Sequence, residues 1–128
     1  RMEEAKALRA SKDVHYNCCQ SVLVPFSDLC GLSKEEAYRL GAHFGGGMRH
    51  GSTCGAVTGA LMVLGMAQGG NAAAGSLLRQ FRAQNKALDC ARLLQLARER
   101  GEDRDSHCDR MVYEAVELTQ QLLAERDE

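Results

Sequence analysis

Apolar residues recur at helical spacing along most of this chain, and the stripe is longest near the C-terminus. Residues three and four positions apart share one face of an α-helix, so such a stripe predicts a helix with one buried face. The members of the last stripe are Cys108, Met111, Val112, Ala115, Val116, Thr119, Leu122 and Leu123. No stretch of useful length alternates between apolar and polar residues, so strands are not expected.

A second segment, from Ser52 or Thr53 to Gln68, is apolar almost all round. That pattern is typical of a helix buried on every side. Gly55 and Gly59 leave it a smooth face on which another helix can pack closely. We expect this glycine- and alanine-rich helix to form the buried centre of the fold.

Capping residues, glycines and one proline mark the expected helix ends. Asn17 and Ser33 are each followed three positions later by Gln or Glu, as in a capping box. Pro25 kinks or ends the helix that Asn17 begins, and Gly75 interrupts another. The helical segments expected before the last stripe are 2–12, 17–26, 33–44, 52–68, 71–86 and 90–100, followed by a polar loop at 101–105. We therefore predict an all-α fold, a compact bundle of about six helices in one domain, 1–128.

Composition and charge exclude several classes of partner. The formal net charge is -1, with no basic stripe, only 5% aromatic residues and no Trp, so nucleic acid is not an expected partner. The longest apolar run, 56–67, is shorter than the roughly 20 residues that a membrane span needs. No charged segment followed by an apolar stretch indicates export, so we expect a cytoplasmic protein.

Six cysteines in 128 residues are too few for the roughly 8–10% typical of a secreted disulfide scaffold. In a reducing compartment they would be thiols, metal ligands or redox groups. No pair has the spacing of a thioredoxin motif, a c-type haem site or a zinc finger. Buried structural cysteines, which act as small apolar residues, remain an alternative.

Four of the six cysteines share a local setting at the start of an expected helix. There the helix dipole and the free N–H groups stabilise a thiolate and lower the pKa of a thiol. The four are Cys18 after Asn17, Cys54 after Thr53, Cys90 after Asp89, and Cys108 after Ser106 and His107. We expect Cys54 to be the most reactive, acting with Cys18, whereas Cys19 and Cys30 lack the pattern and are interpreted as packing or surface residues.

Residues near these cysteines extend the candidate site. Gly45, Gly46 and Gly47 form a loop before Cys54 that would bring backbone close to a cofactor, with Arg49 or His50 offsetting negative charge. The loop lacks the Gly-Lys-Ser/Thr of a P-loop. The histidines that precede the cysteines, His15, His50 and His107, leave a mixed Cys/His metal site open, although polar loop residues are the simpler interpretation.

The chain resembles a family of redox-active proteins named for the pattern Cys…Gly-Cys-Ala-x-x-Gly…Cys…Cys. The matching stretches are 17–23, 44–48 and 53–61, followed by the single residues Cys90 and Cys108. The chain departs from the nominal pattern in two places: Gly55 stands between Cys54 and Ala56, and Cys19 replaces an expected Ala. The resemblance implies a redox or metal-linked role and leaves the substrate open.

Two redox functions are consistent with this pattern, and a third function would not use the cysteines as reactive groups. Four thiolates, from Cys18, Cys54, Cys90 and Cys108, are the usual complement of an iron–sulfur cluster, so one hypothesis is a cluster or other thiolate-held metal for electron transfer or redox sensing. The alternative is a metal-free thiol–disulfide protein. A helical interaction module with structural cysteines is the third. Either redox function requires an unidentified redox partner protein, and a homodimer remains open.

Overall fold

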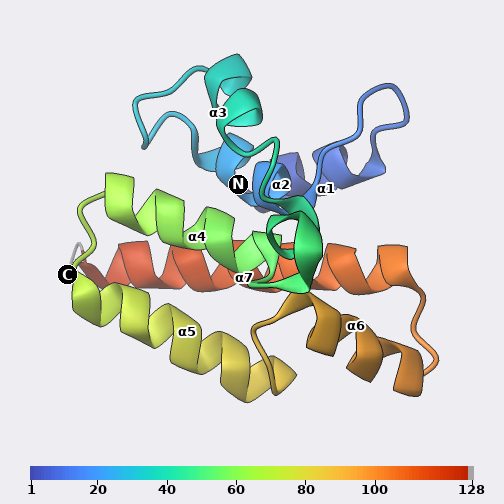
Figure 1. Cartoon of the computed structure of the whole chain (residues 1–128). Helices are drawn as coiled ribbons and strands as arrows, with labels where there is room; N and C mark the ends of the chain where they lie inside the picture. The colour runs from blue at the N-terminus through green and yellow to red at the C-terminus, as the bar shows by residue number, and fades with distance from the viewer. Residues whose placement is uncertain (127–128) are drawn as a thin grey trace.

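In the computed structural model, which describes residues 1–126, every regular element is helical (Figure 1). The α-helices are α1 (Met2–Ala10), α2 (Cys18–Leu23), α3 (Lys34–Leu40), α4 (Gly55–Met66), α5 (Asn71–Asn85), α6 (Cys90–Glu99) and α7 (Arg104–Arg126). A 3-10 turn, η1 (Val24–Phe26), and a π-type turn, η2 (Gly47–Gly51), complete the described chain. The predicted all-α class is confirmed. The described part has seven α-helices, one in each of the six expected segments and one in the last stripe, although the bundle was expected to have about six.

Helix α7 runs the length of the molecule and contacts α1, α2, α4, α5 and α6 (Figure 1). The apolar stripe predicted for it is buried from Met111 to Leu123. The helix begins at Arg104, inside the segment expected to be a polar loop, because the Asp103 carboxylate accepts a hydrogen bond from the Ser106 N–H at 2.8 Å. Cys108 therefore lies in the second turn of α7.

The face of α4 that carries Gly55 and Gly59 packs directly on α2. A Cβ atom at Gly59 would lie 2.8 Å from the Cys19 carbonyl oxygen, and one at Gly55 would lie 3.1 Å from the Cys19 backbone nitrogen. Only a residue without a side chain allows two backbones to come this close. The close packing expected at these two glycines is therefore present, and α2 is its partner.

Several helix boundaries differ from those expected. Helix α3 ends at Leu40 instead of reaching residue 44, and the Asn17 side-chain amide donates to the carbonyls of Gly41 and Ala42, at 3.1 and 3.2 Å, just beyond its end. Gly75 does not interrupt α5, which continues to Asn85. In the part of the chain that the structure describes, no helix has both the length and the hydrophobicity to cross a membrane.

Candidate functional site

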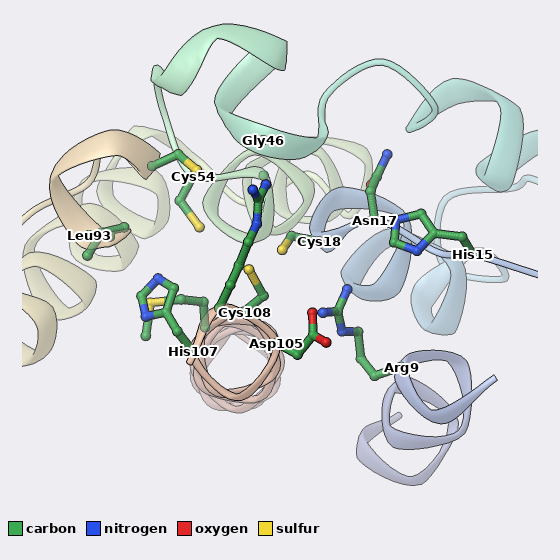
Figure 2. Close-up of a pocket in the computed structure, with 14 residues that line it drawn as sticks. Arg9, His15, Asn17, Cys18, Gly46, Cys54, Leu93, Asp105, His107 and Cys108 are labelled. Atoms are coloured by element: carbon green, nitrogen blue, oxygen red, sulfur yellow. The ribbon is translucent and has the colours of Figure 1, made fainter. Parts of the chain in front are cut away.

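Four cysteines from separate parts of the chain line one cavity of about 110 Å³, which we call the four-cysteine cavity. They are the four singled out in the sequence: Cys18, Cys54, Cys90 and Cys108. Figure 2 shows the sulfur atoms of Cys18, Cys54 and Cys108 directed into the space between α2, α4 and α7. Cys19 and Cys30 are buried elsewhere and do not line this cavity. The chain thus brings together the predicted four and leaves out the other two.

Local backbone pairing places Cys54 and Cys90 next to each other. Thr53 and Asp89 form an isolated antiparallel bridge, the only extended pairing within residues 1–126. On its two sides, the Cys54 N–H donates to the Leu88 carbonyl at 2.8 Å and the Cys90 N–H donates to the Ser52 carbonyl at 2.7 Å. The chain enters α4 and α6 directly after this bridge, so Cys54 immediately precedes α4 and Cys90 is the first residue of α6.

The helix-start setting is present for Cys18 and Cys90 but differs for the other two. Cys18 is the first residue of α2, behind the capping box that Asn17 makes with Gln20, and Cys90 is the first residue of α6. Cys54 occupies the position just before α4. Cys108 lies in the second turn of α7 because the cap is Asp103 and not Ser106, so the dipole argument does not apply to it as predicted.

Cys108 nevertheless has the most acidic thiol of the site. A hydrogen bond from the Cys18 thiol lowers the pKa of Cys108 to about 7, and the nearby guanidinium groups of Arg9 and Arg104 act in the same direction against the effect of burial. The same hydrogen bond raises the pKa of Cys18 well above its usual value. Near neutral pH, therefore, about half of the pairs have lost one proton, and in these the negative charge is on Cys108 and the remaining proton on Cys18.

The surroundings of Cys54 do not favour the thiolate that was expected there. Burial is the largest influence on this side chain and raises its pKa to about 11, although the backbone N–H groups of Ala56 and Val57 act in the opposite direction. A charge in an apolar interior loses its hydration, and two helix-start N–H groups do not compensate for that loss. Burial also raises the pKa of Cys90, and it raises that of Cys19 to about 12.

The positive charges at the cavity come from residues that the sequence analysis did not select. Arg9 and Arg104 line it, whereas Arg49 and His50, expected to offset negative charge there, do not. Arg9 is held in place by Asp109, with Nε to Oδ1 at 2.7 Å. Arg104 could have been found, since it stands four residues before Cys108 and therefore on the same helix face once the start of α7 is known.

Of the three glycines expected to approach a cofactor, only Gly46 lines the cavity. It has a positive φ of 63°, and a Cβ atom there would meet no heavy atom within 4 Å. A Cβ atom at Gly45 would collide with the Asn17 side chain, and one at Gly47 would collide with Ser52 and lie 2.7 Å from the Cys90 Cβ. Gly45 and Gly47 are therefore required for packing around the two cysteine-bearing helix starts.

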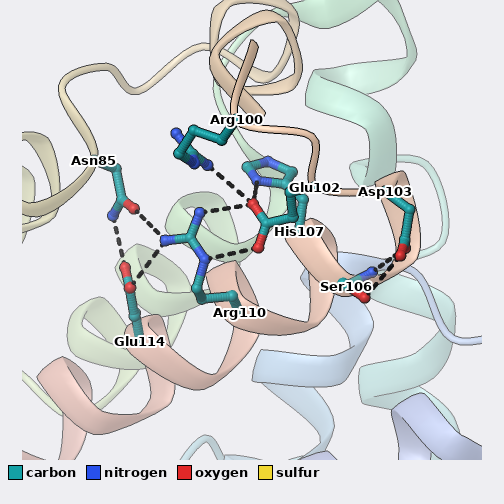
Figure 3. A network of polar contacts seen from close by, with 8 residues as sticks. All are labelled: Asn85, Arg100, Glu102, Asp103, Ser106, His107, Arg110 and Glu114. Carbon is teal, nitrogen blue, oxygen red and sulfur yellow. Dashed lines mark hydrogen bonds and ion pairs between the residues drawn. The ribbon is translucent and has the colours of Figure 1, made fainter. Parts of the chain in front are cut away.

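Two of the three histidines near the cysteines line the cavity, His15 and His107, while His50 does not. His107 is buried, and its Nδ1 atom has no hydrogen-bond partner among the described residues. Burial also lowers its pKa, so it is neutral at pH 7. Its nearest carboxylate oxygen, Glu102 Oε1, is 3.6 Å away and belongs to a network with Arg100 and Arg110 (Figure 3).

A metal or iron–sulfur cluster can be tested against this donor set. Four thiol sulfurs around one small cavity are chemically suited to either group. The arrangement in residues 1–126, however, contains no group of three or more Cys, His, Asp or Glu side chains placed to hold a metal ion. The donor types therefore fit, and their present geometry does not enclose an ion.

Comparison with known proteins identifies one family. A family model described as "Putative redox-active protein (C_GCAxxG_C_C)" matches residues 16–122. No curated protein and no solved structure matches the chain. The matched range contains all four cysteines of the cavity and the run from Cys54 to Gly59 that carries the motif.

Proposed function

The chain belongs to the C_GCAxxG_C_C family of putative redox-active proteins, and on that premise we propose that it is a thiol–disulfide redox protein. In this proposal Cys108 is the attacking thiolate and Cys18 the resolving thiol. The observation that carries it is that these two cysteines face the same four-cysteine cavity (Figure 2), where each shifts the pKa of the other, down for Cys108 and up for Cys18. A thiol with a pKa near the ambient pH combines a useful thiolate fraction with good nucleophilicity.

The proposed reaction is a two-step exchange with a disulfide substrate. The Cys108 thiolate attacks one substrate sulfur, a mixed disulfide forms, and the other half of the substrate leaves as a thiolate. The Cys18 sulfur then attacks the Cys108 sulfur, the Cys18–Cys108 disulfide forms, and the second half leaves. The substrate gains two electrons and the protein loses two; the Cys18 proton and one proton from water neutralise the two released thiolates.

The hydrogen bond also explains why Cys18 reacts second. The largest cause of its raised pKa is the bond that it donates to the Cys108 sulfur. Once Cys108 is in the mixed disulfide, that sulfur has no charge, so Cys18 loses its proton more readily. Cys54, with a pKa of about 11, stays protonated at neutral pH and does not begin the reaction.

Chemical trapping tests this proposal directly. The reduced, metal-free chain is mixed with a small neutral disulfide, quenched with acid, alkylated and mapped by mass spectrometry. We expect one disulfide, between Cys18 and Cys108, and a persistent mixed disulfide at Cys108 when Cys18 is replaced by Ser. The Cys30→Ser variant is the matched control, because Cys30 lies outside the cavity. Formation of a Cys54 adduct first, with Cys108 unmodified, would contradict the proposal.

A second candidate is a thiolate-held metal or iron–sulfur cluster, favoured by the presence of all four thiols at one cavity. Cys18, Cys54, Cys90 and Cys108 would hold the group, which would supply one-electron transfer. Purification without oxygen, followed by measurement of iron, zinc, sulfide and visible absorption, distinguishes the two candidates. A colourless protein without bound metal that still forms the Cys18–Cys108 disulfide would exclude this second candidate.

A further inference from the structure

A second cavity, of about 320 Å³, adjoins the four-cysteine cavity between η2 and α6. The two cavities share three lining residues, Gly46, Cys90 and Arg104. Gly46 leaves open space at this junction, since a Cβ atom there would meet no other heavy atom. A small molecule in the second cavity therefore lies next to Cys90, at the border of the cavity that the other three thiols line.

The charged residues that line the second cavity are both arginines, Arg98 and Arg104, so we call it the arginine cavity. Neither forms an ion pair with a carboxylate in the described part of the chain, unlike Arg9, which is neutralised by Asp109. Asp105 is the one carboxylate lining the adjoining four-cysteine cavity, and it does not reach the arginine cavity. Two guanidinium groups that face one cavity and have no carboxylate partner are suited to a carboxylate or a similar anion.

The start of α6 adds to this positive potential. Its first residues, Cys90 and Ala91, line the arginine cavity, and the residue that precedes them, Asp89, makes no side-chain hydrogen bond to the helix. The partial positive charge of this helix start therefore adds to that of the arginines, and the Asp89 carboxylate, which lines neither cavity, partly offsets it. The volume of the arginine cavity lies in the range typical of small-molecule sites. A folded protein partner would not fit into it.

We infer that the arginine cavity selects small anionic disulfides, holding an acidic group of the substrate between Arg98 and Arg104 while its sulfur–sulfur bond faces Cys108. This inference rests on the proposed thiol–disulfide function and specifies its substrate class. The exchange reaction and its electron balance are the same; the arginines contribute to binding and orientation. Removal of Arg104 would also disturb Cys108, so Arg98 is the informative position.

The test compares three small disulfides that differ in charge: dithiodiglycolate, which is anionic, 2-hydroxyethyl disulfide, which is neutral, and cystamine, which is cationic. The rate of Cys18–Cys108 disulfide formation in the reduced full chain is measured by acid quench for each disulfide. Each rate is then divided by the rate at which the same disulfide reacts with 2-mercaptoethanol, which corrects for its intrinsic reactivity. The Arg98→Gln variant is compared with Arg92→Gln, which removes an exposed arginine of the same helix that lines neither cavity.

At low ionic strength we expect the normalised anionic rate to exceed the cationic rate by about tenfold, because charge in a cleft raises the association rate of an oppositely charged ligand. Arg98→Gln should lower the anionic-to-neutral ratio by roughly threefold or more, and added salt should reduce the difference. Arg92→Gln should not change that ratio. Equal normalised rates for the three disulfides, or equal ratios in both variants, would overturn the inference. Failure of all three to oxidise the chain would instead overturn the proposed function.

Discussion

At the scale of single residues, the site depends on which thiol can carry a charge. Cys54 and Cys108 line the same cavity, but the pKa of Cys54 is raised to about 11 and that of Cys108 is lowered to about 7. The difference comes from neighbours: Cys54 is mainly surrounded by apolar groups, whereas Cys108 accepts a hydrogen bond and lies near two guanidinium groups. Burial without a compensating partner favours the neutral form of any acid.

The Cys18→Ala variant tests this account of Cys108. Because the Cys18 thiol donates the bond that most lowers the pKa of Cys108, its removal should raise that pKa well above 7. The rate of iodoacetamide labelling at Cys108, followed by mass spectrometry as a function of pH, should therefore reach its half-maximum at a higher pH. Cys30→Ala should leave the curve in place. An unchanged curve for Cys18→Ala would mean that the arginines alone stabilise the thiolate.

A second residue-scale prediction concerns Glu102 and acid stability. Hydrogen bonds from Arg110, then Arg100, lower its pKa from 4.5 to about 2 in the folded protein. The unfolded chain therefore binds the proton more readily, so this carboxylate stabilises the fold above pH 4.5 and loses that effect as the pH falls toward 2.

Urea unfolding at a series of pH values measures the effect. The free energy of unfolding should be lower for Glu102→Gln than for the parent by about 1 kcal/mol near neutral pH, since the group is partly exposed. That difference should shrink as the pH falls between 4.5 and 2. Glu99→Gln, at the exposed end of α6, is the control and should show no such trend. A difference that does not depend on pH would refute the explanation.

At the scale of elements, the contact between α2 and α4 positions two of the four thiols. Cys18 begins α2, Cys54 precedes α4, and the glycine face of α4 lets the two helices meet backbone to backbone. The family motif that runs from Cys54 to Gly59 thus combines a site cysteine with the glycines that bring α2 against it. The same short motif therefore supplies a thiol of the site and the glycine contact that holds α2 against α4.

Gly59→Ala tests the packing within this motif. The added methyl group would lie 2.8 Å from the Cys19 carbonyl oxygen, so α2 must shift, and we expect a loss of about 1–3 kcal/mol in the free energy of unfolding. Gly65→Ala is a matched control on the same helix, where a Cβ atom meets nothing within 4 Å. That change should be neutral or stabilise by up to about 1 kcal/mol, because Ala favours helix over Gly. Thermal melts of both variants measure these changes in stability. Equal losses of stability in the two variants would contradict the close contact at Gly59.

At the scale of the whole molecule, the site joins parts of the chain that are far apart in sequence. The cavity is lined by residues of α1, α2, α4, α6 and α7, and α7 contacts the other four of these helices (Figure 1). A bond between Cys18 and Cys108 would link α2, near one end of the chain, to α7, at the other. Oxidation would therefore restrain the unfolded chain over most of its length.

This restraint predicts that oxidation stabilises the fold. A disulfide that closes a loop of roughly 90 residues should raise the free energy of unfolding by about 2–4 kcal/mol, as for other long loops. Melting curves of the chain before and after treatment with a small disulfide measure the effect. The Cys18→Ser variant should gain nothing from the same treatment. A lower melting temperature in the oxidised parent would contradict formation of an unstrained Cys18–Cys108 bond.

Local information in the sequence determined the helical class, most helix starts and the family. Capping residues at Asn17 and Ser33, the stripe in α7 and the smooth face of α4 act over a few neighbouring residues, so they can be recognised without the fold. The start of α7 was missed because Asp103 was interpreted as part of a polar loop, although its capping role is equally local.

Only the tertiary structure decided which cysteine is acidic and which charges surround it. The pKa of a thiol depends on burial, on hydrogen-bond donors and on charges within a few ångströms, and these come from residues such as Arg9 and Cys18 that are distant in sequence from Cys108. The arginine cavity likewise requires α6, η2 and the start of α7 to meet. The four cysteines could be selected from the sequence, although the helix-start setting that singled them out is present only for Cys18 and Cys90, whereas their individual chemistry follows from the packing that brings them together.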